Sequence, residues 1–247
     1  MDDEQLMRYS RQIMLPEVDV AGQEKLCAAR VLIVGMGGLG SPLAMYLAAA
    51  GVGKLILADD DAVDLSNLQR QIVHTQASLG LPKVKSAQHT LNALNPECYL
   101  ETIEARLDAT ALENLLDGVD LVCDASDNFD VRFAINDTCW KAGVPLVSGA
   151  AIRWEGQVTV FDPRDADSPC YRCLYLDGDD QALNCSENGV IAPLVGVIGT
   201  MQAMEAIKLI TGVGESLAGA LLYYDAKYAD WRKLRLPKRQ DCPICSG

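Results

Sequence analysis

The segment RVLIVGMGGLGSPLAMYLAAAGVGKLILADDD, residues 30–61, decides the fold class. Its apolar run at 31–34 predicts a buried strand, and the glycines that follow predict a tight turn. Residues 41–50 predict a helix, and the apolar run at 54–59 predicts a second buried strand. A strand, a helix and a strand in this order form a βαβ unit, whose two strands run parallel.

The same alternation continues as far as residue 151. Further helices and strands are expected in turn at 84–94, 99–103, 109–116, 120–124, 131–140 and 144–151. Strands that alternate with helices predict an α/β fold of Rossmann-like, doubly wound type, with a mainly parallel sheet.

The two ends of the chain follow other patterns. The first 28 residues predict N-terminal helices, one with Leu6, Tyr9 and Ile13 on a single face and a short one around 23–27. After residue 151, GQVTVF is a period-two strand, LLYYDAKYADWRKLRL reads as a hairpin, and a long helix is expected at 193–211. We therefore expect an antiparallel extension of the same sheet.

This pattern divides one domain of residues 1–247 into three parts. Helices occupy 1–28, a nucleotide-binding half occupies 29–151, and an antiparallel half occupies 152–247. A chain of 247 residues is long enough to bury a sizeable core in such a domain.

Charge and composition restrict the partners. Asp and Glu outnumber Lys and Arg by 34 to 21, for a net charge of −13, so nucleic acid and anionic membranes would be repelled. The N-terminus MDDEQLMRYS lacks a basic start with an apolar stretch, and no apolar run approaches the roughly 20 residues of a membrane span. We expect a cytoplasmic protein with neither nucleic acid nor membrane as partner.

The glycine turn has the spacing of a nucleotide site. Gly35, Gly37 and Gly40 satisfy G-x-G-x-x-G, with Gly38 between them, at the junction of a strand and a helix. Such a turn brings phosphate close to the amides at the helix N-terminus. Asp59, about 20 residues on, could accept hydrogen bonds from ribose hydroxyls. A turn selected for packing alone explains the glycines but leaves this acid without a role.

The segment after the second strand indicates which nucleotide is bound. LSNLQRQ, residues 65–71, supplies Asn67 and Arg70, and Lys83 follows in the next loop. Cations that converge on a nucleotide from two loops suit a triphosphate, because its charge must be neutralised during attack at phosphorus. Arg70 and Lys83 could also be ordinary surface charges. An NAD-dependent oxidoreductase would use the same glycines and Asp59, but would leave these cations without roles.

Four of the nine cysteines form two C-x-x-C pairs, Cys170 with Cys173 and Cys242 with Cys245. Two such pairs are typical of a structural zinc site with four thiolates, which leaves no position for water and therefore stabilises the fold without catalysing a reaction. Redox dithiols and chance remain alternatives. A zinc-stabilised module that only docks another protein is a second rival to an enzyme.

The glycine loop, LSNLQRQ, Lys83, SDN and the paired C-x-x-C motifs occur in an order that resembles the MoeB/ThiF/HesA family of adenylyltransferases, which are relatives of ubiquitin-activating enzymes. The resemblance runs from MRYSRQIML to CPICSG. It implies that ATP with Mg²⁺ adenylates the C-terminal glycine carboxylate of a ubiquitin-fold sulfur carrier ending in Gly-Gly, with release of pyrophosphate. The carrier would bind to the antiparallel half.

The resemblance also implies roles for residues of the nucleotide half. Asp59 matches a ribose-binding acid, and Asn67, Arg70 and Lys83 match residues that contact the phosphates. Arg11 matches an arginine that reaches the triphosphate of a neighbouring subunit, which implies a homodimer; from the sequence alone, a solvated helical residue is the alternative.

Two residues have open alternatives. Asp127 follows a parallel strand, and the resemblance makes it a Mg²⁺ ligand or an organiser of the triphosphate, although Asp127 or Asn128 could also cap the next helix. Cys185 lies in the polar segment QALNCSENG and either handles sulfur or is a dispensable thiol.

The carrier and the sulfur donor follow from further parts of the sequence. SGAAIRWEGQVTVF favours a MoaD-like carrier of molybdopterin biosynthesis, whereas ADDDAVDLSNLQRQI is at least as similar to the thiamine branch and its ThiS-like carrier. No rhodanese-like domain is expected after the second cysteine pair, and the sulfur donor is therefore expected to be a separate protein.

Overall fold

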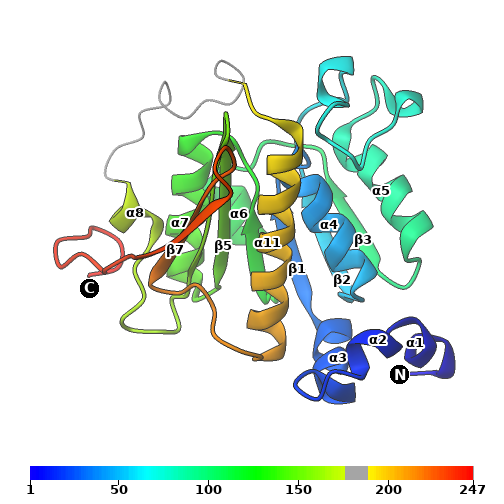
Figure 1. The fold of residues 1–247 in the computed structure, drawn as a ribbon, viewed down its shortest axis with the longest axis horizontal. Helices are drawn as coiled ribbons and strands as arrows, with labels where there is room; N and C mark the ends of the chain where they lie inside the picture. The colour runs from blue at the N-terminus through cyan, green and yellow to red at the C-terminus, as the bar shows by residue number, and fades with distance from the viewer. Residues whose placement is uncertain (176–188, 247) are drawn as a thin grey trace.

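The computed structural model describes residues 1–175 and 189–246, which form an eight-stranded sheet with helices on both faces (Figure 1). The strand order is β3-β2-β1-β4-β5-β6-β7-β8. The strands are β1 (Arg30–Val34), β2 (Lys54–Ala58), β3 (Tyr99–Ile103), β4 (Leu121–Asp124), β5 (Leu146–Ile152), β6 (Glu155–Phe161), β7 (Ala220–Asp225) and β8 (Asp230–Arg235).

The first five strands are parallel, as the sequence predicts. In register, Leu32 of β1 lies beside Ile56 of β2 on one side and Val122 of β4 on the other. The chain builds β1, β2 and β3 outward in one direction and then returns to place β4 on the opposite side of β1. Loops that leave the carboxyl ends of β1 and β4 therefore diverge to opposite faces, which creates a crevice at this point of the sheet.

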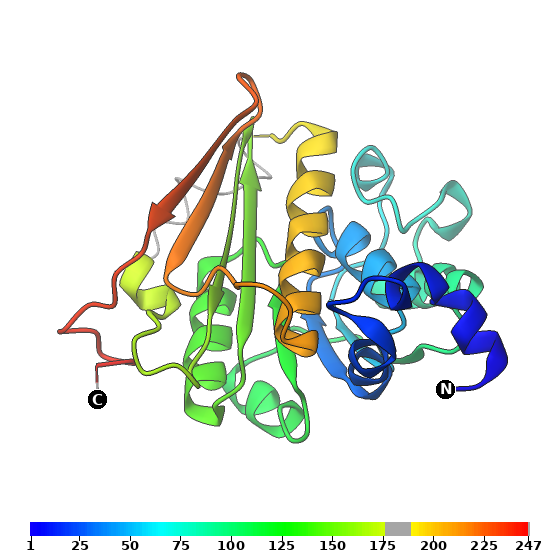
Figure 2. The ribbon, with the colours of Figure 1, turned by 60° about the horizontal axis from the view of Figure 1, so that its bottom comes forward.

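Helices cover both faces of the sheet because its central strands are apolar on both sides. Val31 and Ile33 belong to one core cluster and Leu32 and Val34 to the other. In Figure 2, α11 and α4 lie together on one face, with α6 and α7 on the other. The helices are α1 (Asp3–Arg8), α2 (Ser10–Ile13), α3 (Asp19–Ala28), α4 (Gly40–Ala49), α5 (Lys83–Leu94), α6 (Ala109–Leu115), α7 (Phe129–Ala142), α8 (Tyr171–Leu174) and α11 (Ala192–Thr211), and 3₁₀ turns occur at Leu65–Asn67 and Gln76–Ser78.

The antiparallel extension is confirmed. Strand β6 pairs antiparallel with both β5 and β7, and β7 pairs with β8 in the expected hairpin. Helix α11 packs across β5 and β6, where Gly156 leaves space for the side chain of Ile198; a Cβ at Gly156 would lie 2.5 Å from Ile198 Cγ1.

Helix α11 corrects one prediction from the sequence. Among the described residues it alone is long and apolar enough to cross a membrane by length and composition, with a mean hydropathy of 1.3 over 18 residues. Half of that window is buried within the molecule, including Leu194, Ile198 and Ala206. Its apolar residues therefore supply the core between α4 and the sheet.

The N-terminal helices also differ from the prediction. Tyr9 separates α1 from α2, so Leu6 and Ile13 do not share one continuous helix. The Tyr9 ring is buried, and its hydroxyl accepts a hydrogen bond from Asn95 Nδ2 at 2.9 Å, which draws the chain inward at this residue. Helix α3 begins at Asp19, four residues before the expected start at 23.

Candidate active site

A cleft of about 310 Å³ opens at the carboxyl ends of β1, β2 and β4, where the crevice is expected. It brings together most of the residues singled out from the sequence, including Gly35, Gly37, Gly38, Asp59 and Asp127. Within the part of the chain that the structure describes, its charged lining consists of four cations and four carboxylates, namely Arg70, Lys83, Arg106, Arg132, Asp59, Asp60, Asp61 and Asp127. The cations balance the carboxylates in the cleft, whereas the whole chain has a net charge of −13, so the cleft repels an anion less than the average surface does.

The glycine loop packs too closely for larger residues. Gly35 has a φ of +96°, and a Cβ on it would lie 2.6 Å from the Ala125 carbonyl oxygen. A Cβ on Gly40 would lie 1.9 Å from the Gly35 carbonyl oxygen. Gly40 does not line the cleft itself, but begins α4 and lets the loop close behind the lining residues. The glycine backbone just before α4 therefore forms one wall of the cleft. Backbone amides at a helix N-terminus favour the binding of phosphate.

Asp59 follows β2 and holds the glycine loop. Its Oδ2 accepts a hydrogen bond from Met36 N at 2.7 Å, and its Oδ1 accepts one from Asp61 N at 2.9 Å. Burial raises the pKa of Asp59, an effect that the nearby Lys83 partly opposes. Each carboxylate oxygen has a second lone pair, so these bonds leave acceptor capacity for ribose hydroxyls.

The two expected phosphate cations reach the cleft from different elements. Lys83 begins α5 and is buried, with Nζ 2.6 Å from Asp61 Oδ2. Arg70 is half-buried, and its Nη1 donates to the Ser66 carbonyl oxygen at 3.0 Å. Asn67 does not line the cleft; its Oδ1 accepts from Asp64 N at 3.1 Å and closes the 3₁₀ turn before Arg70.

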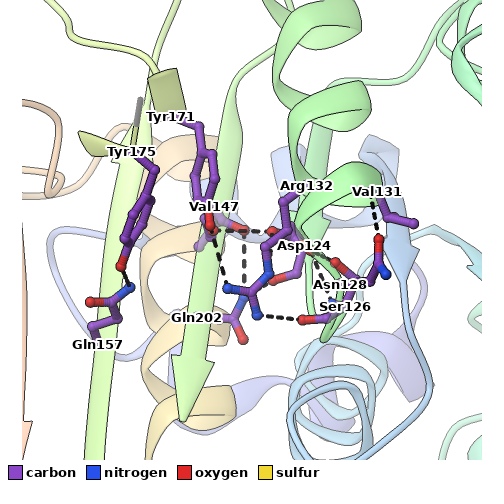
Figure 3. Close-up of polar contacts among 11 residues, drawn as sticks. Asp124, Ser126, Asn128, Val131, Arg132, Val147, Gln157, Tyr171, Tyr175 and Gln202 are labelled. Atoms are coloured by element: carbon purple, nitrogen blue, oxygen red, sulfur yellow. Dashed lines mark hydrogen bonds and ion pairs between the residues drawn. The ribbon is translucent and has the colours of Figure 1, made fainter. Parts of the chain in front are cut away.

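The turn after β4 separates the roles of two neighbouring residues. Asn128 Oδ1 accepts from Val131 N at 3.1 Å and caps α7 (Figure 3). The cap is therefore Asn128, and the exposed carboxylate of Asp127 stays at the cleft. An exposed carboxylate in the same cleft as Arg70 and Lys83 fits the preference of Mg²⁺ for oxygen ligands.

Sequence reasoning missed the buried pair Asp124 and Arg132 beneath this turn. Arg132 also lines the cleft, and its Nε lies 3.9 Å from Asp124 Oδ2. Although burial opposes the charged form, the Asp124 carboxylate raises the pKa of Arg132. The feature of the sequence that could have pointed to this pair is Arg132, which lies one turn into the helix that follows SDN. It was indistinguishable from a surface charge without knowledge of which face of α7 is buried.

Arg11 lies away from this cleft. It lines a separate cavity of about 410 Å³ between α2, α4 and α11, where Tyr46 and Met204 remain 56% and 55% exposed. The cleft of one chain therefore does not include its own Arg11 among its lining residues. Cys185 lies outside the described residues.

The four paired cysteines form a cluster that could hold a metal. Their sulfur atoms all lie within 4.8 Å of one another, with Cys170 Sγ 3.5 Å from Cys242 Sγ and Cys173 Sγ 3.4 Å from Cys245 Sγ. A tetrahedral zinc site with Zn–S bonds of about 2.3 Å has sulfur atoms about 3.8 Å apart, so the spacing fits zinc. Burial raises the pKa of Cys242, but hydrogen bonds from the Cys245 and Ile244 amides outweigh it and lower the pKa to about 7.

Comparison with known proteins agrees with this geometry. The model of the ThiF family matches residues 9–244. The chain belongs to the ThiF family. Within the ThiF family it is 49% identical to the molybdopterin-synthase adenylyltransferase of Salmonella typhimurium, over 99% of this chain and 98% of that protein. It is 46% identical to the sulfur carrier protein ThiS adenylyltransferase of Escherichia coli, over 100% and 98% of the two chains.

The fold of this ThiF protein also occurs in more distant structures. Escherichia coli MccB crystallised with ATP has a TM-score of 0.85 and 23% identity, over 97% of this chain and 75% of that one. At this identity the likeness concerns the α/β fold alone. The cleft, the cations and the paired cysteines of the ThiF chain must carry any argument about its chemistry.

Proposed function

We propose that the protein uses ATP to adenylate the C-terminal glycine carboxylate of a ubiquitin-fold sulfur carrier. The observation that carries this proposal is the meeting of Arg70, Lys83 and Asp127 around one glycine loop. The full-length relatives named adenylyltransferases support it. An NAD site needs the loop and Asp59 but no such cluster of cations, so the oxidoreductase alternative is weaker.

The reaction joins two anions and therefore needs charge neutralisation and alignment. The carrier carboxylate attacks the α-phosphorus, a new C–O–P linkage forms, and the bond to the departing pyrophosphate breaks. We assign Arg70 and Lys83 to the phosphate oxygens and Asp59 to the ribose, and Asn67 to the turn that carries Arg70. Asp127 would hold Mg²⁺, which supplies further neutralisation of the phosphate charge when it is bound.

A second cavity supports the entry of a glycine-rich tail. It measures about 70 Å³, adjoins the cleft at Arg132 and Ala151, and is also lined by Ala150 and Gly156. Its small volume and its three small lining residues, set among larger ones such as Gln157 and Tyr223, suit an extended Gly-Gly segment better than a chain with large side chains. In this proposal the antiparallel half presents this cavity, and the carrier binds over it.

We favour a MoaD-like carrier over a ThiS-like one. The identity to the molybdopterin-synthase enzyme is 49% and that to the ThiS enzyme is 46%, so both carriers must be tested. The decisive experiment is ATP–pyrophosphate exchange with Mg²⁺ and each carrier in turn. Exchange with the MoaD-like carrier alone is expected. Binding of NADH without exchange with either carrier, from folded protein, would overturn adenylation, and carrier binding without any exchange would favour a docking module.

We further propose that the active form is a homodimer in which Arg11 completes the cleft of the neighbouring subunit. This arrangement is motivated by the position of Arg11, which lines a separate cavity and not the cleft of its own chain. Arg11→Ala and Asp127→Ala should each be inactive alone. After unfolding and refolding together, half of the dimers would be mixed and each would hold one intact site, so about one quarter of the wild-type activity should return. If the mixture is shown to contain mixed dimers and no activity returns, Arg11 does not complete the cleft of the neighbouring subunit.

Three further parts of the proposal complete the assignment. The four cysteines hold structural zinc, because their spacing and thiolate chemistry fit it. The whole chain acts as one adenylyltransferase domain in the cytoplasm. A separate protein supplies sulfur to the acyl adenylate, and any role of Cys185 is assigned to that later step.

A further inference from the structure

Arg132 is a buried cation at the junction of the cleft and the narrow second cavity. Figure 3 shows its guanidinium between Ser126 on one side and Tyr171 on the other. Its Nη2 donates to the Ser126 carbonyl oxygen at 2.6 Å, and its Nη1 lies 3.5 Å from the Tyr171 hydroxyl. Within the described residues, its buried Nε has no hydrogen-bond partner, and the nearest acid is Asp124 at 3.9 Å.

Arg132 and Asp124 both hold Ser126, in the turn after β4, through hydrogen bonds. Asp124 Oδ1 accepts from Ser126 N at 3.0 Å and from Ser126 Oγ at 2.6 Å, while Arg132 holds the Ser126 carbonyl oxygen. Asp124 is fixed in turn by Ser148 Oγ on its Oδ2 and by Gln202 Nε2 on its backbone carbonyl oxygen. The next residue after Ser126 is Asp127, so the position of its carboxylate depends on this arrangement.

The same arginine connects the turn to the cysteine cluster. Tyr171 is buried directly after Cys170, and its backbone N donates to Asn136 Oδ1 at 2.7 Å. Its ring packs edge-on against Phe133 and Phe161. Arg132 thus lies where α7, α8 and the turn after β4 meet.

We infer that Arg132 is a positioning residue of the adenylation site, which sets the turn that presents Asp127 to Mg²⁺ and the triphosphate. A buried ion pair is weak evidence for stability, because desolvation offsets much of the attraction. A guanidinium fork, in contrast, fixes direction as well as charge, whereas a lysine ammonium is a compact point charge without a rigid planar arrangement of donors. The contacts of Arg132 with a backbone carbonyl and a phenol use this geometry.

This inference rests on the proposed function, but the experiment can refute the role of Arg132 and the adenylation reaction separately. Arg132→Lys keeps the charge beside Asp124 and loses the fork. Since a variant that leaves Asp124 unpaired could fail to fold, the double variant Arg132→Gln with Asp124→Asn neutralises both partners. Arg172→Gln is the matched control, because Arg172 joins α8 to α7 through Asp137 at 2.7 Å without a contact to the turn.

Two measurements distinguish positioning from general stabilisation. The Mg²⁺ concentration for half-maximal pyrophosphate exchange should rise in Arg132→Lys, and kcat should fall by about 100-fold, as expected for a catalytic group displaced by about 1 Å. Calorimetric ATP binding without Mg²⁺ should stay close to wild type in the same variant, whereas binding with Mg²⁺ should weaken. In Arg172→Gln, with its metal content verified, thermal stability should fall while the Mg²⁺ requirement stays unchanged.

Each outcome decides one question. An unchanged Mg²⁺ requirement and kcat in folded Arg132→Lys and in the folded double variant would overturn the positioning role. Equal loss of ATP binding with and without Mg²⁺ would also overturn it, because the arginine would then act on the nucleotide or the fold. If the wild-type protein binds MgATP but exchanges with no carrier, the proposed function fails, and the calorimetric comparison still decides the role of Arg132.

Discussion

The nucleotide half and the antiparallel half bring their functional residues together in different ways. In the nucleotide half, Gly35, Asp59 and Asp127 each follow a parallel strand, so a single rule of topology places them at one edge of the sheet. In the antiparallel half, Cys170 and Cys242 are 72 residues apart and meet only after the chain has passed through α11 and the hairpin of β7 and β8. The first site follows from strand order, whereas the second closes a long loop at an entropic cost that a metal can offset.

The largest expected effect concerns chemistry in the nucleotide half. Asp127→Ala or Lys83→Met should lower pyrophosphate exchange by about 100-fold to 1,000-fold, the typical loss when one preorganised charge of a transition state is removed. The fold of Asp127→Ala should survive, because Asn128 and not Asp127 caps α7, and that of Lys83→Met should survive because the partner left unpaired, Asp61, is exposed to solvent. Asp130→Asn is the control, since this exposed acid of the same region does not line the cleft. Near-normal exchange in both cleft variants would refute the site.

The antiparallel half should respond in stability. Cys170→Ser should lower bound zinc below one ion per chain and reduce the free energy of unfolding by about 3 kcal/mol or more, because binding at such a site contributes to folding. Thermal unfolding and metal analysis, with and without a chelator, measure both effects. Cys27→Ser, at a half-buried thiol outside the cluster, should change neither. Full stability of a metal-free Cys170→Ser protein would show that the long loop closes without a metal.

Two glycines, one in each half, contrast a tightly packed position with an open one. Gly40→Ala places a Cβ 1.9 Å from the Gly35 carbonyl oxygen and should cost about 2 kcal/mol of stability and weaken ATP binding. Among the described residues, and apart from its chain neighbours and its own helix backbone, no atom of the protein lies within 4 Å of a Cβ on Gly196 in α11, so Gly196→Ala should stabilise the protein by about 0.5–1 kcal/mol. Denaturant unfolding measures the free energy of unfolding of both variants. Equal changes in this free energy would contradict the predicted difference between the two positions.

The smallest effect is a dependence on pH from His74, which joins the glycine loop to α5. Since the Met36 carbonyl can only accept, His74 Nε2 donates to it at 2.9 Å and Nδ1 accepts from Ser86 Oγ at 2.9 Å. Burial lowers the pKa of His74 below 6.5, with a smaller contribution from Lys83. The unfolded chain therefore takes up this proton at higher pH than the folded protein does. Stability from His74 is complete above pH 6.5 and falls as the pH drops toward the folded pKa.

Thermal unfolding between pH 5 and 8 checks this sign. His74→Gln should flatten the pH dependence of the unfolding temperature, whereas His89→Gln, at the exposed second histidine, should leave the slope as in wild type. An unchanged slope in His74→Gln would mean that the buried imidazole does not control stability in this range.

Much of the nucleotide half could be predicted from local sequence. The glycine spacing, the apolar runs and the acid after the second strand identified the βαβ unit and the cleft, because parallel topology constrains where strand ends lie. The break at Tyr9 could not be predicted, since the apolar face continues through it and only the distant Asn95 draws the ring inward. Helix α11, in contrast, was predicted at 193–211 and lies at Ala192–Thr211, although its length and composition alone would also suit a membrane span.

By itself, the sequence determined the fold class, the order of the strands in the chain and the chemical types available for a nucleotide and a metal. Only the tertiary structure decided which residues share a site. It brought Lys83 to Asp61, placed Arg11 outside the cleft, and buried Arg132 beside Asp124 beneath the turn that bears Asp127. The physical reason is that periodicity records which face of an element is apolar, whereas the partner of a buried charge depends on how separate elements pack together.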